Sequence, residues 1–236
     1  MTAPLVSVLM AVGPGARADW AAEALRSLLR QIAPPAMEVI IVLDGAPFEI
    51  TDEPDDWGPD AGGLLRLVSQ AHAGLAASLN RAACLAGGHL YARMDADDIA
   101  HPKRLARQVD ALRSLGVDVL GTWAHEYGVV NGLMRYPVGH TEILAAMPRH
   151  NPFCHPTVLM RREAFWRAGG YEGGPGQDWR LWRRMAAQGA RFANLPEPLL
   201  YYRRHRGQVS AGWRGRAAAW SGRLSPLLRV PGQRSH

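Results

Sequence analysis

The acidic cluster formed by Asp95, Asp97 and Asp98 is the part of the sequence best suited to chemistry. It follows residues 90–94, an apolar run with the length of a buried strand. Open α/β sheets bind ligands at the carboxyl ends of their strands. Asp95 and Asp97 are two residues apart, so on an extended chain their side chains point to the same side. Carboxylates held so close repel each other, and a hard divalent ion carrying a diphosphate would relieve that repulsion.

A simpler interpretation of the same residues is a turn followed by a helix N-cap. Short Asp-x-Asp motifs are common by chance, and Asp is a frequent N-cap residue. Pro102, which is tolerated in the first turn of a helix, follows closely and predicts a helix start. The choice between a metal site and a helix N-cap depends on the patterns in the rest of the chain.

The chain before the cluster predicts a βαβ framework. Residues 5–12 and 37–43 are near-continuous apolar runs, which is typical of buried parallel strands. Residues 19–31 between them have helical periodicity, with Asp19 as the expected N-cap. We therefore expect an α/β fold with a mostly parallel central sheet flanked by helices. Further elements are expected at residues 64–68 (strand) and 75–85 (helix).

The second half of the chain predicts a mixture of helices and strands. The Asn131-Gly132 pair indicates a hairpin turn. The expected elements are helices at 102–115, 142–147, 162–168 and 178–188, and strands at 117–123, 158–160 and 199–203.

The composition predicts one large globular domain. The chain has 236 residues, 47% of them hydrophobic, and a formal net charge of +6, which favours anionic partners without choosing among them. Cys84 and Cys154 have neither metal-ligand spacing nor a disulfide framework. The amino terminus does not resemble a signal peptide and no apolar run approaches about 20 residues, so we expect a cytoplasmic protein.

Two segments have a different character. Residues 46–63 are rich in Pro, Gly and acidic residues and predict a long solvated loop. Residues 211–236 form a basic C-terminal tail that contains Arg, Trp and Leu but no acidic residue. This tail is either frayed or an amphipathic segment that makes peripheral contact with an anionic membrane at its inner face.

Eight short motifs, in order, resemble those of a family-2 glycosyltransferase of the GT-A fold, and they cover residues 5–210. The pieces are Val6-Ser7-Val8-Leu9-Met10, Ala24-Leu25-Arg26-Ser27-Leu28, Glu38-Val39-Ile40-Ile41-Val42-Leu43-Asp44-Gly45, Gly74-Leu75 with Leu79-Asn80, Ala92-Arg93-Met94-Asp95-Ala96-Asp97-Asp98 with Pro102, Asn151-Pro152 with Gly169-Gly170-Tyr171, Gln177-Asp178-Trp179 with Leu181-Trp182, and Asn194-Leu195-Pro196 with Tyr202-Arg203-x-His205. Each piece alone is weak evidence, but their shared order is strong evidence.

The resemblance implies one domain over residues 1–210, with a nucleotide-binding half at about 1–100 and an acceptor half at about 101–210. It implies transfer of a sugar, with inversion, from a nucleotide-sugar donor to a hydroxyl of a glycan or lipid-linked acceptor. A UDP-sugar is the favoured donor, Mg²⁺ or Mn²⁺ the metal, and cell-surface polysaccharide the product. Nucleic acid is not an expected partner.

The resemblance also gives the acidic residues roles. Asp44 would bind the base or ribose, Asp95 the ribose or a water, and Asp97 the metal. Asp178 would be the general base, because an inverting displacement needs a carboxylate on the acceptor side. Asp98 is expected to cap the next helix.

Four basic residues are weaker candidates. His205 is a further metal or phosphate ligand if the family ending applies, and otherwise a solvated surface residue. Arg81 and Arg93 are diphosphate contacts by position only. His155 is expected to be a core histidine with its hydrogen bonds satisfied.

The chain departs from the family pattern at residues 11–15, Leu43 and Gln177, which puts the base-binding wall and the level of activity in doubt. A catalytically inactive nucleotide-sugar binding module is therefore one alternative. A haloacid-dehalogenase-like phosphatase, with Asp95 as nucleophile and Asp97 as acid/base, is another. That chemistry needs a lysine beside the phosphate, and Lys103 falls inside the predicted helix.

Overall fold

The computed structural model describes residues 5–46 and 65–205. The chain divides into two compact units, Met1–Arg203 and Arg204–His236. The first unit contains all the helices and almost all of the sheet described below. The expected loop at 46–63 and the tail at 211–236 fall almost entirely outside the described residues, and so does the expected start of the third strand at residue 64.

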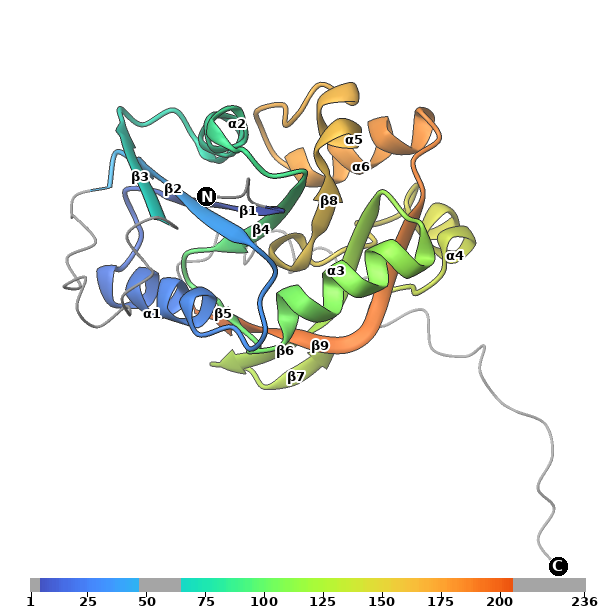
Figure 1. Ribbon diagram of the computed structural model, residues 1–236, viewed down its shortest axis with the longest axis horizontal. Coiled ribbons are helices and arrows are strands. Elements are labelled where there is room, and N and C mark those ends of the chain that lie inside the picture. The colour runs from blue at the N-terminus through green and yellow to red at the C-terminus, as the bar shows by residue number, and fades with distance from the viewer. Residues whose placement is uncertain (1–4, 47–64, 206–236) are drawn as a thin grey trace, which may run out of the picture. The chain divides into compact units, whose positions relative to one another are not determined.

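Four parallel strands form one half of the sheet (Figure 1). They are β1 (Val6–Val12), β2 (Met37–Asp44), β3 (Leu65–Gln70) and β4 (Leu90–Asp95), in the spatial order β3-β2-β1-β4. The register pairs Ala11 of β1 with Asp95 of β4, and Asp44 of β2 with Gln70 of β3. The carboxyl ends of these strands therefore meet at one edge, where Asp44 and Asp95 both lie.

The other half of the sheet is antiparallel. From β4 the order continues β8-β6-β9-β5, and β7 pairs with β6. These strands are β5 (Ile99–Ala100), β6 (Val119–Gly128), β7 (Gly132–Met134), β8 (Leu159–Arg161) and β9 (Phe192–Arg204). β6 and β7 form the hairpin that the sequence predicts near Asn131-Gly132, although the connection spans residues 129–131 and Gly132 is already the first residue of β7.

Helices cover both faces of the sheet, which explains why β1, β2 and β4 are largely apolar and buried, whereas the edge strand β3 is more polar and exposed. One core packs α1 (Ala18–Leu29) and α3 (Arg104–Leu115) against alternate strand residues such as Val8 and Met10. The other core contains Leu9 and the helices α2 (Leu75–Leu85), α4 (His140–Ala146), α5 (Arg162–Arg167) and α6 (Gln177–Ala187). The expected α/β fold class is confirmed (Figure 1).

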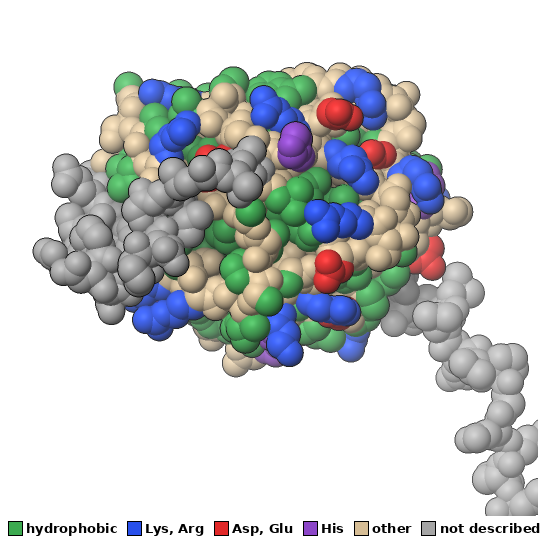
Figure 2. Space-filling model, viewed as in Figure 1, with side chains coloured by type: hydrophobic (Ala, Val, Ile, Leu, Met, Phe, Trp, Pro, Cys, Tyr) green, Lys and Arg blue, Asp and Glu red, His purple; other side chains and the backbone are tan. Residues whose placement is uncertain are grey.

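Among the described residues, none of the helices combines the length and the apolar character needed to cross a bilayer. On the face shown in Figure 2, the Lys and Arg side chains are spread among hydrophobic and neutral ones.

Several element boundaries predicted from the sequence are wrong. Asp19 is not the N-cap of α1; Arg17 is, and Asp19 lies in the first turn, paired with Arg17. Helix α3 begins at Arg104, two residues after Pro102. Strand β9 begins at Phe192 rather than 199, although it contains Pro196 and Pro198, because tertiary pairing outweighs the low strand propensity of proline.

Candidate active site

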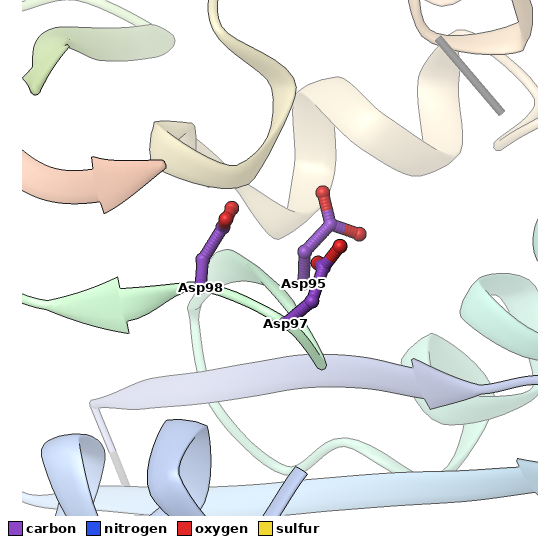
Figure 3. A group of neighbouring side chains, drawn as sticks. All are labelled: Asp95, Asp97 and Asp98. Carbon is purple, nitrogen blue, oxygen red and sulfur yellow. The ribbon is translucent and has the colours of Figure 1, made fainter. Parts of the chain in front are cut away.

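Asp95 is the last residue of β4, and Asp97 and Asp98 follow in the turn before β5. One carboxylate oxygen from each of the three residues lies within 4.8 Å of the others. Figure 3 shows the side chains of Asp95 and Asp97 close together, with Asp98 beside them. The strand end thus gathers the three carboxylates that the sequence predicts to be near one another.

Asp98 does not cap α3, so this expectation is wrong. The N-cap of that helix is Lys103, and the Asp98 side chain is instead buried, with 1% of its surface exposed. Its Oδ1 accepts a hydrogen bond from the backbone N–H of Arg203 at 2.9 Å, whereas its buried Oδ2 has no hydrogen-bond partner among the described residues. Contact with β9, which no local pattern specifies, turns this side chain inward.

The electrostatics of the cluster fit a cation site. Burial, and then the charges of Asp95 and Asp97, raise the pKa of Asp98 well above its usual range. Burial also raises the pKa of Asp95, and the charge of Asp97 adds to the effect. A divalent cation among these oxygens would remove the repulsion and give the orphaned Oδ2 of Asp98 a partner. The carboxylates present are therefore the donor set that Mg²⁺ or Mn²⁺ requires.

Arg93 lies beneath the cluster. Its guanidinium is buried, with 1% exposed, and pairs with Asp95 Oδ1 at 2.5 Å. Burial is the largest single influence and would lower the pKa of Arg93, but the charges of Asp95, Tyr171 and Asp98 and the hydrogen bond to Asp95 together outweigh it, so the pKa is raised and the arginine stays a cation. The structure therefore places Arg93 against Asp95, and a direct contact with a diphosphate stays a prediction.

Asp44 anchors the loop that leads into α2. It is buried, with 2% exposed, and its carboxylate accepts hydrogen bonds from the backbone N–H groups of Ala73 and Gly74, at 2.7 and 2.9 Å. Gln70 Nε2 also donates to it at 2.7 Å, and His72 Nδ1 lies 2.9 Å away. The described contacts of Asp44 thus fix the turn between β3 and α2.

Arg81 is linked to the Asp44 carboxylate indirectly, through Gln70. From α2 its Nη1 donates to Gln70 Oε1 at 3.0 Å, and Gln70 in turn donates to Asp44. Arg81 is exposed and so is available to an anion at this edge of the sheet. A diphosphate contact by Arg81 stays a prediction.

Asp178 lies in the first turn of α6, and Gly176 rather than Asp178 is the N-cap of this helix. Asn151 Nδ2 donates to Asp178 Oδ2 at 2.5 Å. The charge of Asp178 contributes to the raised pKa of Asp95, which shows that α6 brings this carboxylate near the cluster. The helix N-terminus favours a negative charge at this position.

A hydrogen-bonded pair joins α2 to the loop before α6. Asn80 Nδ2 donates to the carbonyl of Tyr171 at 2.8 Å, and the Tyr171 N–H donates to Asn80 Oδ1 at 2.9 Å. The hydroxyl of Tyr171 lies 2.8 Å from His155 Nε2, so this histidine is satisfied, as expected, and burial lowers its pKa well below the usual value. A cavity lined only by uncharged residues, among them Gly74, Asn80 and Gln177, opens beside this pair.

His205 belongs to the second unit, Arg204–His236, and its role as a metal or phosphate ligand stays a prediction. The site also contains partners that the sequence reasoning missed. Nothing in the sequence singles out His72 as a site residue, and Asn151 and Arg203 stand there only as parts of motifs. Their partners lie 27 to 106 residues away along the chain, so no local pattern reveals these contacts.

The family model and the similar proteins all identify glycosyltransferases. A family model described as glycosyl transferase family 2 matches residues 16–169. The O-antigen biosynthesis glycosyltransferase WbnJ of Escherichia coli is 29% identical over 208 residues, which cover 85% of this chain and 80% of that protein. The UDP-Gal:alpha-D-GlcNAc-diphosphoundecaprenol beta-1,3-galactosyltransferase of Escherichia coli is 28% identical over 203 residues, covering 84% and 73%.

Solved structures show the same fold. The mannosyltransferase PcManGT of Pyrobaculum calidifontis, in complex with GDP-Man and Mn²⁺, superposes with a TM-score of 0.66 at 21% identity. The match covers 92% of this chain but only 61% of that one, so the chain corresponds to part of the larger structure.

Proposed function

The chain belongs to glycosyl transferase family 2, and we propose that it transfers a sugar, with inversion, from a nucleotide-sugar donor to a hydroxyl of a glycan or lipid-linked acceptor. The product is a cell-surface polysaccharide or its precursor. The fold supports this proposal because the required groups lie at the carboxyl edge of the sheet, where α/β proteins bind nucleotides.

One observation carries the proposal. One carboxylate oxygen from each of Asp95, Asp97 and Asp98 lies within 4.8 Å of the others, and the charge of Asp178, 83 residues further along the sequence, is a smaller influence on the pKa of Asp95. An inverting transfer needs both a cation-binding cluster for the diphosphate and a separate carboxylate for the acceptor proton. The pairing of the carboxylate cluster with one further carboxylate supplies both.

We assign the roles as follows. Asp97 and its neighbours Asp95 and Asp98 hold Mg²⁺ or Mn²⁺, which supplies Lewis-acid stabilisation of the departing diphosphate when bound. Arg93 pairs with Asp95, and its positive charge opposes the burial that raises the pKa of Asp95. Asp178 accepts the proton of the acceptor hydroxyl as that oxygen attacks the anomeric carbon of the donor sugar, and Asn151 orients the carboxylate.

Two further features support our placement of the donor base and sugar. Asp44 lies at the carboxyl end of β2, and Arg81 of α2 reaches Gln70 at the carboxyl end of β3, where we place the nucleotide. The uncharged cavity beside Asn80 and Gln177 suits a neutral sugar, whose hydroxyls hydrogen-bond to amides and backbone groups.

The relatives narrow the substrates only in part. The galactosyltransferase is named for UDP-Gal and a diphosphoundecaprenol acceptor, while the mannosyltransferase structure holds GDP-Man. We propose a UDP-sugar and a lipid-linked acceptor, with a GDP-sugar as the alternative donor. Action in the cytoplasm, and membrane contact by residues 211–236, stay predictions.

The deciding experiment measures hydrolysis and transfer of UDP-, GDP- and dTDP-sugars in the presence of Mn²⁺. We expect turnover of one donor by the wild type and a loss of at least about 100-fold in Asp178→Asn, while donor binding persists. Arg107→Ala, on the outer surface of α3, is the control and should retain activity.

Two outcomes would contradict this proposal. Metal-dependent nucleotide binding without turnover of any donor would favour the inactive binding module. Cleavage of phosphomonoesters would favour the phosphatase, but Lys103 is exposed at the N-cap of α3, and the family match also opposes that alternative.

A further inference from the structure

Arg203, near the end of β9, makes two hydrogen bonds to the turn that carries the carboxylates. Its Nε donates to the backbone carbonyl of Asp97 at 2.8 Å. Its backbone N–H donates to Oδ1 of Asp98 at 2.9 Å. Asp97 and Asp98 are thereby attached to a strand more than 100 residues away in sequence.

The guanidinium of Arg203 is itself held by two aromatic rings and by an ion pair. Its central carbon lies 4.8 Å from the centre of the Trp20 ring and 4.8 Å from the centre of the Tyr127 ring. Its Nη2 forms an ion pair with Glu23 of α1. The side chain is only 15% exposed. A planar guanidinium can stack on two rings and donate from its edge at the same time, which a lysine ammonium cannot do.

We propose that Arg203 is a positioning residue for the metal-binding turn, which it holds in the conformation that the cation requires. The inference rests on the proposed role of Asp97 and its neighbours as metal ligands. Three carboxylates within 4.8 Å of one another repel, so without restraint the turn would relax and separate them. The two hydrogen bonds from Arg203 fix residues 97 and 98 before the cation arrives, and this lowers the cost of assembling the site.

The side chain acts on metal affinity through its edge contact with the carbonyl of Asp97. The backbone N–H of residue 203 remains in any variant, so substitution isolates the guanidinium. Lysine keeps the positive charge but loses the planar stacking between Trp20 and Tyr127 and the simultaneous bonds to Glu23 and Asp97. Glu23→Gln removes only the ion pair between Glu23 and the guanidinium. It should therefore weaken metal binding less than a substitution of Arg203 does.

The test is a titration of the full-length protein with MnCl₂, without donor, followed by the electron paramagnetic resonance signal of free Mn²⁺. We expect Arg203→Lys and Arg203→Ala to weaken Mn²⁺ binding about 10- to 100-fold, the range typical of residues that support metal ligands. The matched control is Arg107→Ala, because Arg107 also contacts β9, through Glu197 at 2.5 Å. That control should bind Mn²⁺ as the wild type does.

Thermal unfolding with and without Mn²⁺ separates positioning from a purely structural role. A positioning role predicts a smaller Mn²⁺-induced rise in Tm in Arg203→Lys, whereas a purely structural role lowers Tm equally in both conditions. If Arg203→Ala does not fold, the Mn²⁺ affinities of Arg203→Lys and Glu23→Gln still test the positioning role. Unchanged Mn²⁺ affinity in Arg203→Lys, together with loss of binding in Asp97→Asn, would overturn the positioning role of Arg203 but leave the proposed metal site standing. Absence of Mn²⁺ binding by the wild type would overturn the proposed metal site and this inference with it.

Discussion

The side-chain amide of Asn151 donates to Asp178 at 2.5 Å, across 27 residues of sequence. Asn151 is itself held, because its Oδ1 accepts a hydrogen bond from the N–H of Phe153 at 3.2 Å. Phe153 is buried against Trp182 of α6, with ring centres 5.5 Å apart. The orientation of Asp178 is therefore set from outside its own helix.

Asn151→Ala should lower kcat while leaving the KM for the donor almost unchanged. A misplacement of a catalytic group by about 1 Å can cost about 100-fold, so we expect a loss of 10- to 100-fold. Steady-state kinetics with the active donor measure both constants. Asn131→Ala, in the turn of the β6–β7 hairpin, is the control. An unchanged kcat in Asn151→Ala would show that Asp178 needs no such support.

Asp44→Asn should destabilise the protein at pH 7 by about 2 kcal/mol, the scale of hydrogen bonds to a charged group. Burial alone would raise the pKa of Asp44, but the hydrogen bonds from Gln70 and from the N–H groups of Ala73 and Gly74 outweigh it and hold the pKa below its usual value. This stabilisation is present above the unfolded pKa of about 4 and is lost as the pH falls through the lower folded pKa.

Urea denaturation of the wild type and of Asp44→Asn between pH 7 and pH 3 provides the measurement. The difference in the free energy of unfolding should be constant from pH 7 to about pH 5 and shrink at lower pH. A difference that stays constant down to pH 3 would mean that the carboxylate charge contributes nothing to this turn.

Gly121→Ala should destabilise the protein by about 1–3 kcal/mol, the usual cost of overpacking a core. A Cβ at Gly121 would lie 2.1 Å from Asn194 Oδ1 and 2.7 Å from the ring of Phe153. Because Phe153 adjoins Asn151, we also expect reduced activity. Gly139→Ala, where no atom lies within 4 Å of the added carbon, is the control, and equal stability of the two variants would contradict the packing described here.

Removal of divalent metal with EDTA should abolish turnover, and Mn²⁺ should restore it. Asp97→Asn should also abolish metal-dependent donor binding while its far-ultraviolet circular dichroism remains that of the wild type. Calorimetry with the nucleoside diphosphate, with and without Mn²⁺, measures the binding. Donor binding by Asp97→Asn that still depends on Mn²⁺ as in the wild type would exclude this residue as a metal ligand.

The amino-acid sequence by itself determined the parallel half of the sheet and the location of the carboxylate cluster. Strands β1, β2 and β4 are apolar along their length because both faces are covered, and this pattern is local and readable. Asp95 lies at the sheet edge because the apolar run ends there. The amphipathic pattern of α6 likewise placed Asp178 at a helix start.

Tertiary structure decided how the parts of the site are held together. Strand β5 has only two residues and exists because Ile99 and Ala100 pair with Tyr201 and Leu200 of β9. The same strand turns Asp98 inward, so the sequence-based assignment as a helix cap failed. Hydrophobic periodicity reports whether a residue is buried, whereas the partner of a buried polar group depends on which distant segments the fold brings together.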